Sequence, residues 1–140
     1  VRRLLQRLSG ELKLPVYCLV DNDPWGLYIY SVLKQGSINL AFESMRLAVP
    51  NVRFIGMSSL DYEKFDLPSA VEIKLSKEDI QRAQQMKKYP WFADAKWQRE
   101  IDALLKNGFK MEVDSLLSKS IEFMTEEYLP KKLRDRDYLT

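Results

Sequence analysis

The chain has 140 residues, of which 46% are hydrophobic and 30% charged, and its formal net charge is +2. These values are typical of one domain with a buried core and exclude a disordered chain. With no histidine and a single cysteine, the sequence excludes a Ser-His-Asp triad, a disulfide framework and nearly all zinc sites. A metal bound here would need oxygen ligands, which favours magnesium, manganese or calcium.

The small net charge does not favour a domain that holds DNA through a broad cationic surface. No apolar run approaches the roughly 20 residues needed to cross a bilayer, and none resembles a signal peptide. Cys18 lies in an apolar run and is interpreted as a core residue, because no histidine is present to act as its base. We therefore expect a cytoplasmic globular protein.

The first half of the chain reads as an α/β unit. Residues 2–9 have the periodicity of an amphipathic helix, and residues 14–20 form an apolar run typical of a strand buried on both faces. A helix over residues 24–35 follows, apolar nearly all round, and we expect it to be buried. Asp23 is its predicted N-cap and Gly36 its end.

Residues 38–42 and 52–55 are further strand candidates, and residues 58–75 read as irregular. The remainder, residues 76–140, is expected to be a helical extension. Ser76 and Asp79 form a capping box at the start of a helix over residues 77–88. Two more helices are predicted from apolar faces, and Pro130 is expected to end the helical run. The faces comprise Trp97, Ile101, Leu104 and Leu105 in the first, and Val113, Leu116, Leu117, Ile121 and Met124 in the second.

The sharpest chemical feature is an acidic pair, Asp21 and Asp23, directly after the first predicted strand. Residues two apart point the same way along an extended backbone, so both carboxylates can reach one cation. Magnesium shared with a phosphate is typically held by one or two carboxylates plus waters. The alternative is structural: Asp23 caps the helix and Asp21 lies in a loop. The pair alone does not decide between these interpretations.

Residues 14–26 resemble the D-x-D-P-[aromatic]-G signature of the Toprim domain in topoisomerase VI A subunits, a family related to the meiotic double-strand-break transesterases. The similarity covers essentially the whole chain, in order. The lysine-rich end of the chain, together with Trp91-Phe92, resembles archaeal members of the family. The similarity continues through Arg2-Arg3-Leu4-Leu5, Gly36-Ser37, Phe42-Glu43-Ser44, Arg46-Leu47-Ala48-Val49-Pro50, Phe54-Ile55-Gly56, Tyr89-Pro90-Trp91-Phe92, Trp97-Gln98-Arg99-Glu100 and Tyr128-Leu129-Pro130-Lys131-Lys132-Leu133.

This resemblance implies a Toprim α/β fold, with a small, partly parallel sheet flanked by helices over residues 1–75 and the helical extension over residues 76–140. It implies that Asp21 and Asp23 bind Mg²⁺, or alternatively Mn²⁺. It also implies duplex DNA as substrate, a homodimer of A subunits, an ATPase B subunit as partner, and a location on the nucleoid, or in the nucleus of a eukaryote. In the family, a tyrosine attacks a DNA phosphodiester and forms a 5′-phosphotyrosyl bond.

The family's third acid, a glutamate, and its nucleophilic tyrosine are expected to lie before Val1. No catalytic residue is therefore expected in this chain, and we predict that it cannot cleave DNA alone. The candidates for DNA contacts are Arg2, Arg3 and Arg46, with solvated surface or a salt bridge as the alternative. Two other functions stay open: a meiotic-type break-forming protein without strand passage, and a non-catalytic interaction domain that retains the fold.

Overall fold

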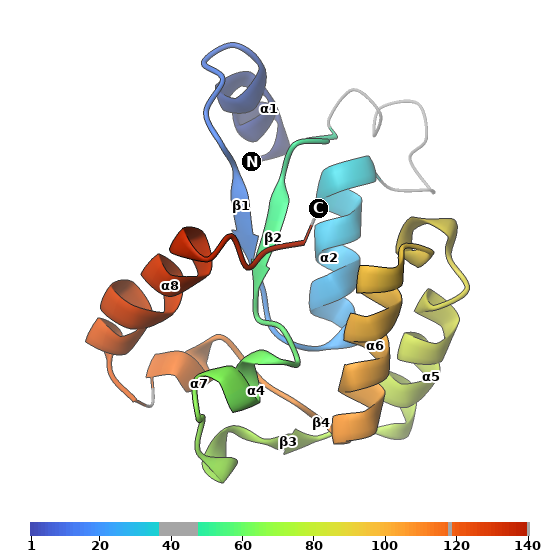
Figure 1. Ribbon diagram of the computed structural model, residues 1–140. Helices are drawn as coiled ribbons and strands as arrows, with labels where there is room; N and C mark the ends of the chain where they lie inside the picture. Colours follow the sequence, from blue (N-terminus) through green and yellow to red (C-terminus); the bar gives the residue numbers. More distant parts are fainter. Residues whose placement is uncertain (37–47, 118, 140) are drawn as a thin grey trace.

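The computed structural model describes residues 1–36, 48–117 and 119–139 (Figure 1). Its elements, in chain order, are α1 (Arg2–Gly10), β1 (Tyr17–Leu19), α2 (Pro24–Gln35), β2 (Arg53–Gly56), α4 (Asp61–Lys64), the 3₁₀ turn η2 (Ser69–Val71), β3 (Ile73–Lys74), α5 (Lys77–Met86), the 3₁₀ turn η3 (Pro90–Phe92), α6 (Ala95–Asn107), β4 (Phe109–Lys110), α7 (Asp114–Leu117), the π-helical η4 (Phe123–Tyr128) and α8 (Leu129–Arg134). None of the helices among these residues is long and apolar enough to cross a membrane.

The centre of the fold is a parallel pair of strands, β1 and β2, with Cys18 opposite Phe54. This pairing confirms two of the three predicted strands and the α/β class. The third, residues 38–42, lies outside the described residues. The expectation that the first strand is buried on both faces was wrong, because β1 spans three residues and Tyr17 is 37% exposed. Because parallel strands end at the same edge of a sheet, the loops that follow β1 and β2 lie together. The short strand-like contact between Phe54 and Leu139 adds two backbone hydrogen bonds, of 2.7 and 2.8 Å, on β2.

Helices flank the strand pair on both sides, with α2, α5 and α6 on one side and α4, α7 and α8 on the other (Figure 1). Two apolar clusters fill the spaces between them. On the α2 side, the rings of Tyr30, Phe54 and Trp97 pack with centroids 5.3–5.4 Å apart. On the α8 side, the buried side chains of Met57 and Tyr128 belong to the second cluster.

The predicted helix over residues 24–35 is confirmed as α2, but it is buried on one face only. Leu27 and Tyr30 are almost fully buried, whereas Trp25 and Ile29 are more than half exposed. The predicted capping box is also confirmed, because Ser76 and Asp79 exchange side-chain and backbone hydrogen bonds at the start of α5. The helix ends at Met86.

Two predictions for the second half were wrong. The expected uninterrupted helix through residues 113–124 is broken: α7 ends at Leu117, and the hydroxyl of Ser120 accepts a hydrogen bond from the Phe123 amide at the start of a new helix. This local cap outweighs the apolar periodicity, so Ile121 is 66% exposed. The helical run also does not end at Pro130, because the π-helical η4 continues directly into α8, and Pro130 lies in the first turn of α8.

The expectation that residues 58–75 are irregular was also wrong, since they contain α4 and β3, and the strand β4 was not predicted either. It pairs with β3 in an antiparallel ladder that matches Ile73 with Lys110 and Lys74 with Phe109. Strands of two residues are too short to produce an alternating pattern that could be recognised in the sequence. Residues after position 76 thus contribute a strand as well as helices, and the backbone of Met111 pairs with that of Asn22 next to the acidic pair.

Candidate metal site

The segment that leaves β1 places two carboxylates on either side of a buried amide. Asn22 is 1% exposed, and its backbone forms two hydrogen bonds with Met111, of 2.8 and 3.1 Å. Its side-chain amide donates to the carbonyl of Met57 at 3.3 Å and to the hydroxyl of Ser59 at 3.0 Å. Asn22 is therefore fixed from both sides, and this holds the neighbouring Asp21 and Asp23 in place.

Each of the two carboxylates is oriented by one backbone N–H. Oδ1 of Asp21 accepts a hydrogen bond of 2.7 Å from the amide of Val113. Oδ1 of Asp23 accepts one of 2.6 Å from the amide of Gly26, and in this way Asp23 caps α2 as predicted. Among the described residues, no hydrogen bond is made to the second oxygen of either carboxylate. The capping and metal-binding interpretations are therefore compatible, since capping uses only one oxygen of Asp23.

The electrostatic environment of Asp23 favours a bound cation. Burial is the main cause that raises the pKa of Asp23, and the nearby charge of Asp21 adds to this effect. The hydrogen bond from Gly26 and the charge of Lys110 oppose it without cancelling it. A partly buried pair of negative charges is destabilised by desolvation and mutual repulsion, and a cation between them relieves both.

The space beside the carboxylates is open. A hollow of about 400 Å³ is bordered by both acids together with Trp25, Ile29 and Val113. Gly26 allows the chain to turn closely here, because a β-carbon on this residue would lie 2.1 Å from the carbonyl oxygen of Asp21. This steric restriction explains why the D-x-D-P-[aromatic]-G pattern has a glycine at its last position.

These residues fit part of a magnesium site. Two free carboxylate oxygens next to open space suit a cation that keeps several waters. Over residues 1–36, 48–117 and 119–139, no cluster of three or more acidic, histidine or cysteine side chains is placed to hold a metal. Asp21 and Asp23 are therefore the only ligand pair that the described residues offer at this position.

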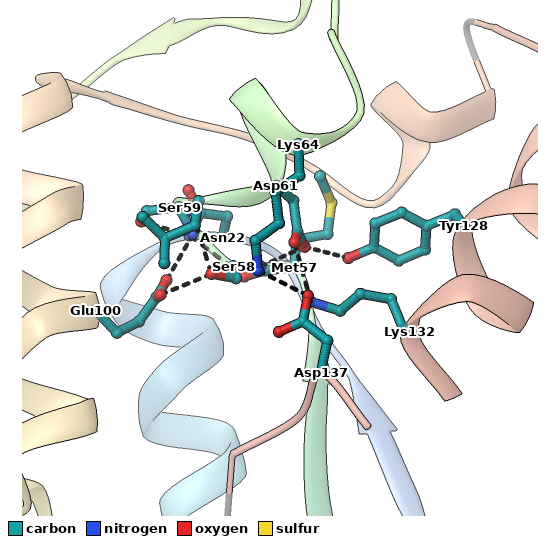
Figure 2. Close-up of polar contacts among 11 residues, drawn as sticks. Asn22, Met57, Ser58, Ser59, Asp61, Lys64, Glu100, Tyr128, Lys132 and Asp137 are labelled. Atoms are coloured by element: carbon teal, nitrogen blue, oxygen red, sulfur yellow. Dashed lines mark hydrogen bonds and ion pairs between the residues drawn. The ribbon is translucent and has the colours of Figure 1, made fainter. Parts of the chain in front are cut away.

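A buried carboxylate from α6, which was not predicted as a site residue, supports the loop after β2. Glu100 is 3% exposed, and its carboxylate accepts hydrogen bonds from the hydroxyl of Ser58 at 2.7 Å and the amide of Ser59 at 2.6 Å (Figure 2). Burial raises the pKa of Glu100, although these hydrogen bonds oppose the shift. Since Ser59 also accepts from Asn22, Glu100 is connected to the acidic segment through one intermediate residue.

A second buried carboxylate, Asp61, joins the same loop to the carboxy-terminal helices. It is fully buried and accepts hydrogen bonds from the hydroxyl of Tyr128 at 2.5 Å and the ammonium group of Lys132 at 2.9 Å (Figure 2). Burial, followed by the charge of Asp61, raises the pKa of Tyr128 far above the ordinary range. Tyr128 is thus a neutral hydrogen-bond donor within the core, and its 0% exposure excludes contact with a substrate in this structure.

Sequence reasoning assigned no role to Glu100, Tyr128 or Lys132. All three lie in stretches that carry the family resemblance, and that was the only signal available for them. The hydrogen bonds join residues 41, 67 and 71 positions apart in the chain, a distance over which periodicity and spacing carry no information.

The predicted DNA-contact residues are not gathered at the acidic pair. Arg3 is exposed on α1 and Arg2 is half-buried, whereas Asp21 and Asp23 lie at the opposite end of β1 (Figure 1). Arg46 lies outside the described residues. Cys18 packs against the core as expected, and burial raises the pKa of its thiol to about 11, which makes it a poor nucleophile.

Comparison with known proteins identifies a family for nearly the whole chain. The family model that describes the Toprim domain of the topoisomerase 6 A subunit and Spo11 matches residues 1–133. Among curated proteins, the chain is 46% identical to the type 2 DNA topoisomerase 6 A subunit of Hyperthermus butylicus over 147 aligned residues, covering 99% of this chain and 38% of the relative.

Two further relatives extend the comparison. The protein of the same name from Sulfurisphaera tokodaii is 44% identical, again over 99% of this chain and 38% of the relative. "Meiotic recombination protein SPO11-1" of Oryza sativa subsp. indica is 40% identical over 95% of this chain and 35% of the relative. The chain thus spans little more than a third of the length of each relative. From these matches and the α/β architecture, the chain belongs to the family of topoisomerase VI A subunits and Spo11 proteins and represents its Toprim domain.

Proposed function

We propose that this chain is the metal-binding part of a type IIB DNA topoisomerase A subunit, an enzyme that makes transient double-strand breaks in duplex DNA. The observation that carries the proposal is the pair of oriented carboxylates, Asp21 and Asp23, each with one oxygen free beside an open hollow. The 46% identity with a topoisomerase relative over nearly the whole chain supports the same interpretation.

Asp21 and Asp23 would hold Mg²⁺, or Mn²⁺ in its place, through their free oxygens. When bound, such an ion supplies a positive charge that stabilises phosphoryl oxygens of DNA during cleavage and rejoining. The residues of this chain contribute positioning: the Val113 and Gly26 amides fix the rotamers of the two acids. Asn22 locks the segment between them by its four hydrogen bonds.

The nucleophilic tyrosine and a third acid would come from other parts of the whole protein. Tyr30 and Tyr128 do not suit the nucleophile's role, since both are buried and have raised pKa values, chiefly from burial. The proposed partners are the ATPase B subunit and a second copy of the A subunit. We expect this chain alone to form no covalent adduct with DNA, and an adduct trapped on the isolated chain would contradict this assignment.

A meiotic-type break-forming protein is the second candidate, supported by the 40% identity with the rice recombination protein. The topoisomerase function takes precedence because the topoisomerase relatives named above are more similar, at 46% and 44%. Supercoil relaxation by the complete protein with its ATPase partner separates the two, since a break-forming protein passes no strand.

The metal site is tested by calorimetric titration of Mn²⁺ and Mg²⁺ into the chain and its Asp21→Asn/Asp23→Asn variant. We expect saturable binding that the variant loses, with at least about a tenfold rise in Kd, because the charged ligands are removed and no histidine is present to replace them. Glu126→Gln/Glu127→Gln removes two exposed acids that do not border the hollow and is the charge-matched control.

Equal binding by the chain, the site variant and the control would contradict a metal site at Asp21 and Asp23. That result would favour the non-catalytic interaction domain, which retains the fold without needing a cation. The titration is repeated on a longer chain that includes the upstream glutamate, where a third carboxylate is expected to raise the affinity.

A further inference from the structure

A second hollow, which shares no lining residue with the one beside the acidic pair, is enriched in cationic side chains. It has a volume of about 300 Å³ and lies where α6, the loop after β2 and the carboxy-terminal residues meet. Five cationic side chains line it: Lys64, Lys96, Arg99, Lys132 and Arg136. The anionic residues on its wall are Glu100 and Asp137.

Both anionic residues are already satisfied by neighbours. The carboxylate of Glu100 is buried and accepts hydrogen bonds from Ser58 and Ser59. Asp137 forms ion pairs with Lys64 at 2.8 Å and with Lys132 at 3.3 Å, and it connects the rim of the hollow to the buried Lys132–Asp61 pair (Figure 2). These contacts leave little negative charge to neutralise the other cations.

Three cations of the hollow have no such partner. Lys96, Arg99 and Arg136 are exposed, and none of them forms an ion pair with any residue that the structure describes. Lys96 and Arg99 lie near the amino-terminal end of α6, a helix of 13 residues whose dipole also favours an anion there. Like charges gathered around one concave space repel each other, and an anion bound between them removes this repulsion.

The turn that ends α8 places Arg136 at the hollow. Its φ angle is 52°, in the left-handed region that residues with a side chain rarely adopt, and its amide bonds to the carbonyl of Leu133 at the end of α8. A left-handed residue just after a helix is a common helix ending, and Lys13 and Asp66 adopt the same conformation elsewhere in the chain. The left-handed turn brings the chain around the end of α8 into the segment that continues to Leu139, so that Arg136 borders the hollow.

We propose that this hollow is a binding site for a phosphate-type oxyanion, held by Lys96, Arg99 and Arg136. A tetrahedral phosphate has oxygens on every side and suits ligands arriving from different elements, and the guanidinium groups match its geometry in pairs of hydrogen bonds. The oxyanion is either a free phosphate group or a phosphodiester of a nucleic acid. The site requires neither a metal at Asp21 and Asp23 nor DNA cleavage, so its failure and that of the proposed function are distinguishable.

The test is calorimetric titration of inorganic phosphate, in buffer without divalent cations, into the chain and its Lys96→Gln/Arg99→Gln variant. We expect saturable binding whose Kd rises at least about tenfold in the variant, because two charge-assisted contacts are lost. The control, Lys88→Gln/Arg134→Gln, removes one lysine and one arginine that are exposed outside the hollow, and is expected to change the Kd by less than about twofold. Circular dichroism verifies that each variant is folded.

A competition arm identifies the source of the oxyanion. If a short DNA duplex displaces phosphate from the chain, and the Lys96→Gln/Arg99→Gln variant weakens duplex binding too, the site takes a phosphodiester. If phosphate binds but the duplex does not displace it, the site takes a free phosphate group. The proposal is overturned if neither probe binds saturably, or if the control variant loses as much affinity as the hollow variant.

Discussion

At residue 26 the chain has no room for a side chain. A β-carbon there would lie 2.1 Å from the carbonyl oxygen of Asp21 and 3.3 Å from Oδ1 of Asp23, so the first turn of α2 and the acidic segment would have to separate. Both carboxylates would then lose their present orientation. Adding a methyl group at residue 26 is therefore expected to change both the stability of the fold and the affinity of the acidic pair for a metal ion.

We expect Gly26→Ala to lower the free energy of unfolding by about 1–3 kcal/mol, as overpacking does, and to weaken Mn²⁺ binding about tenfold. Thermal unfolding and calorimetry measure the two effects. Gly10→Ala is the matched control, since a β-carbon at residue 10 meets nothing within 4 Å and alanine is the better helix former. Unchanged metal affinity in Gly26→Ala would show that the carboxylates are not positioned by this contact.

At the scale of elements, an ion pair ties β4 to the first turn of α5. Lys110 bonds to Asp79 at 2.9 Å, and Asp79 is the same residue that completes the capping box of α5. Burial acts to raise the pKa of Asp79, but hydrogen bonds from Lys110 and Ser76 outweigh it, and the pKa lies below its ordinary value of 3.8. The hydrogen bond to Asp79 likewise raises the pKa of Lys110 above 10.5.

These two shifts define a pH window for the stability that the pair contributes. The contribution of Asp79 is complete above pH 3.8 and is lost as the pH falls through its lowered pKa. That of Lys110 is complete below pH 10.5 and is lost as the pH rises through its raised pKa. We expect Lys110→Met to cost about 1 kcal/mol between these limits and less at either extreme. Urea unfolding at several pH values measures it, and a cost that is constant with pH would contradict the ion pair as its cause.

The helix caps are the features that could be predicted from the sequence. The cap at Asp23 and the capping box of Ser76 and Asp79 depend on residues three apart, so the local sequence determines them. The break in the helix before residue 121 was not predicted. The hydroxyl of Ser120 caps a new helix there, although the apolar side chains keep a helical spacing across the break. The sequence contains both signals and does not show which one determines the structure. The positions of Asp21 and Asp23 were predictable for the same local reason, whereas their support by Val113 and Met111 was not.

At the scale of the whole molecule, one buried ion pair joins the loop after β2 to the last helix. Lys132 is 2% exposed and Asp61 is fully buried, and they lie 71 positions apart in the chain. Breaking a buried pair by removing one partner leaves an uncompensated charge, which is far more costly than losing a surface contact. We therefore expect this contact to couple the carboxy-terminal helices to the parallel strands.

Lys132→Met should lower the free energy of unfolding by about 3–5 kcal/mol, measured by urea unfolding. Lys131→Met, at the adjacent exposed lysine, is the control and should change it by less than about 1 kcal/mol. Asp61→Asn/Lys132→Met removes both charges and should restore part of the loss. If the two single lysine variants were equally stable, the buried pair would have no structural role.

The backbone contact between Phe54 and Leu139 lies along the side of β2 that does not face β1. A strand with free N–H and C=O groups along one side can be extended by a strand from another copy, which leads to aggregation. On β2, Leu139 occupies part of that side with its two hydrogen bonds. Leu139 therefore covers part of the edge of β2 that a strand from another copy would otherwise pair with, a contact separate from the acidic pair and from the cationic hollow.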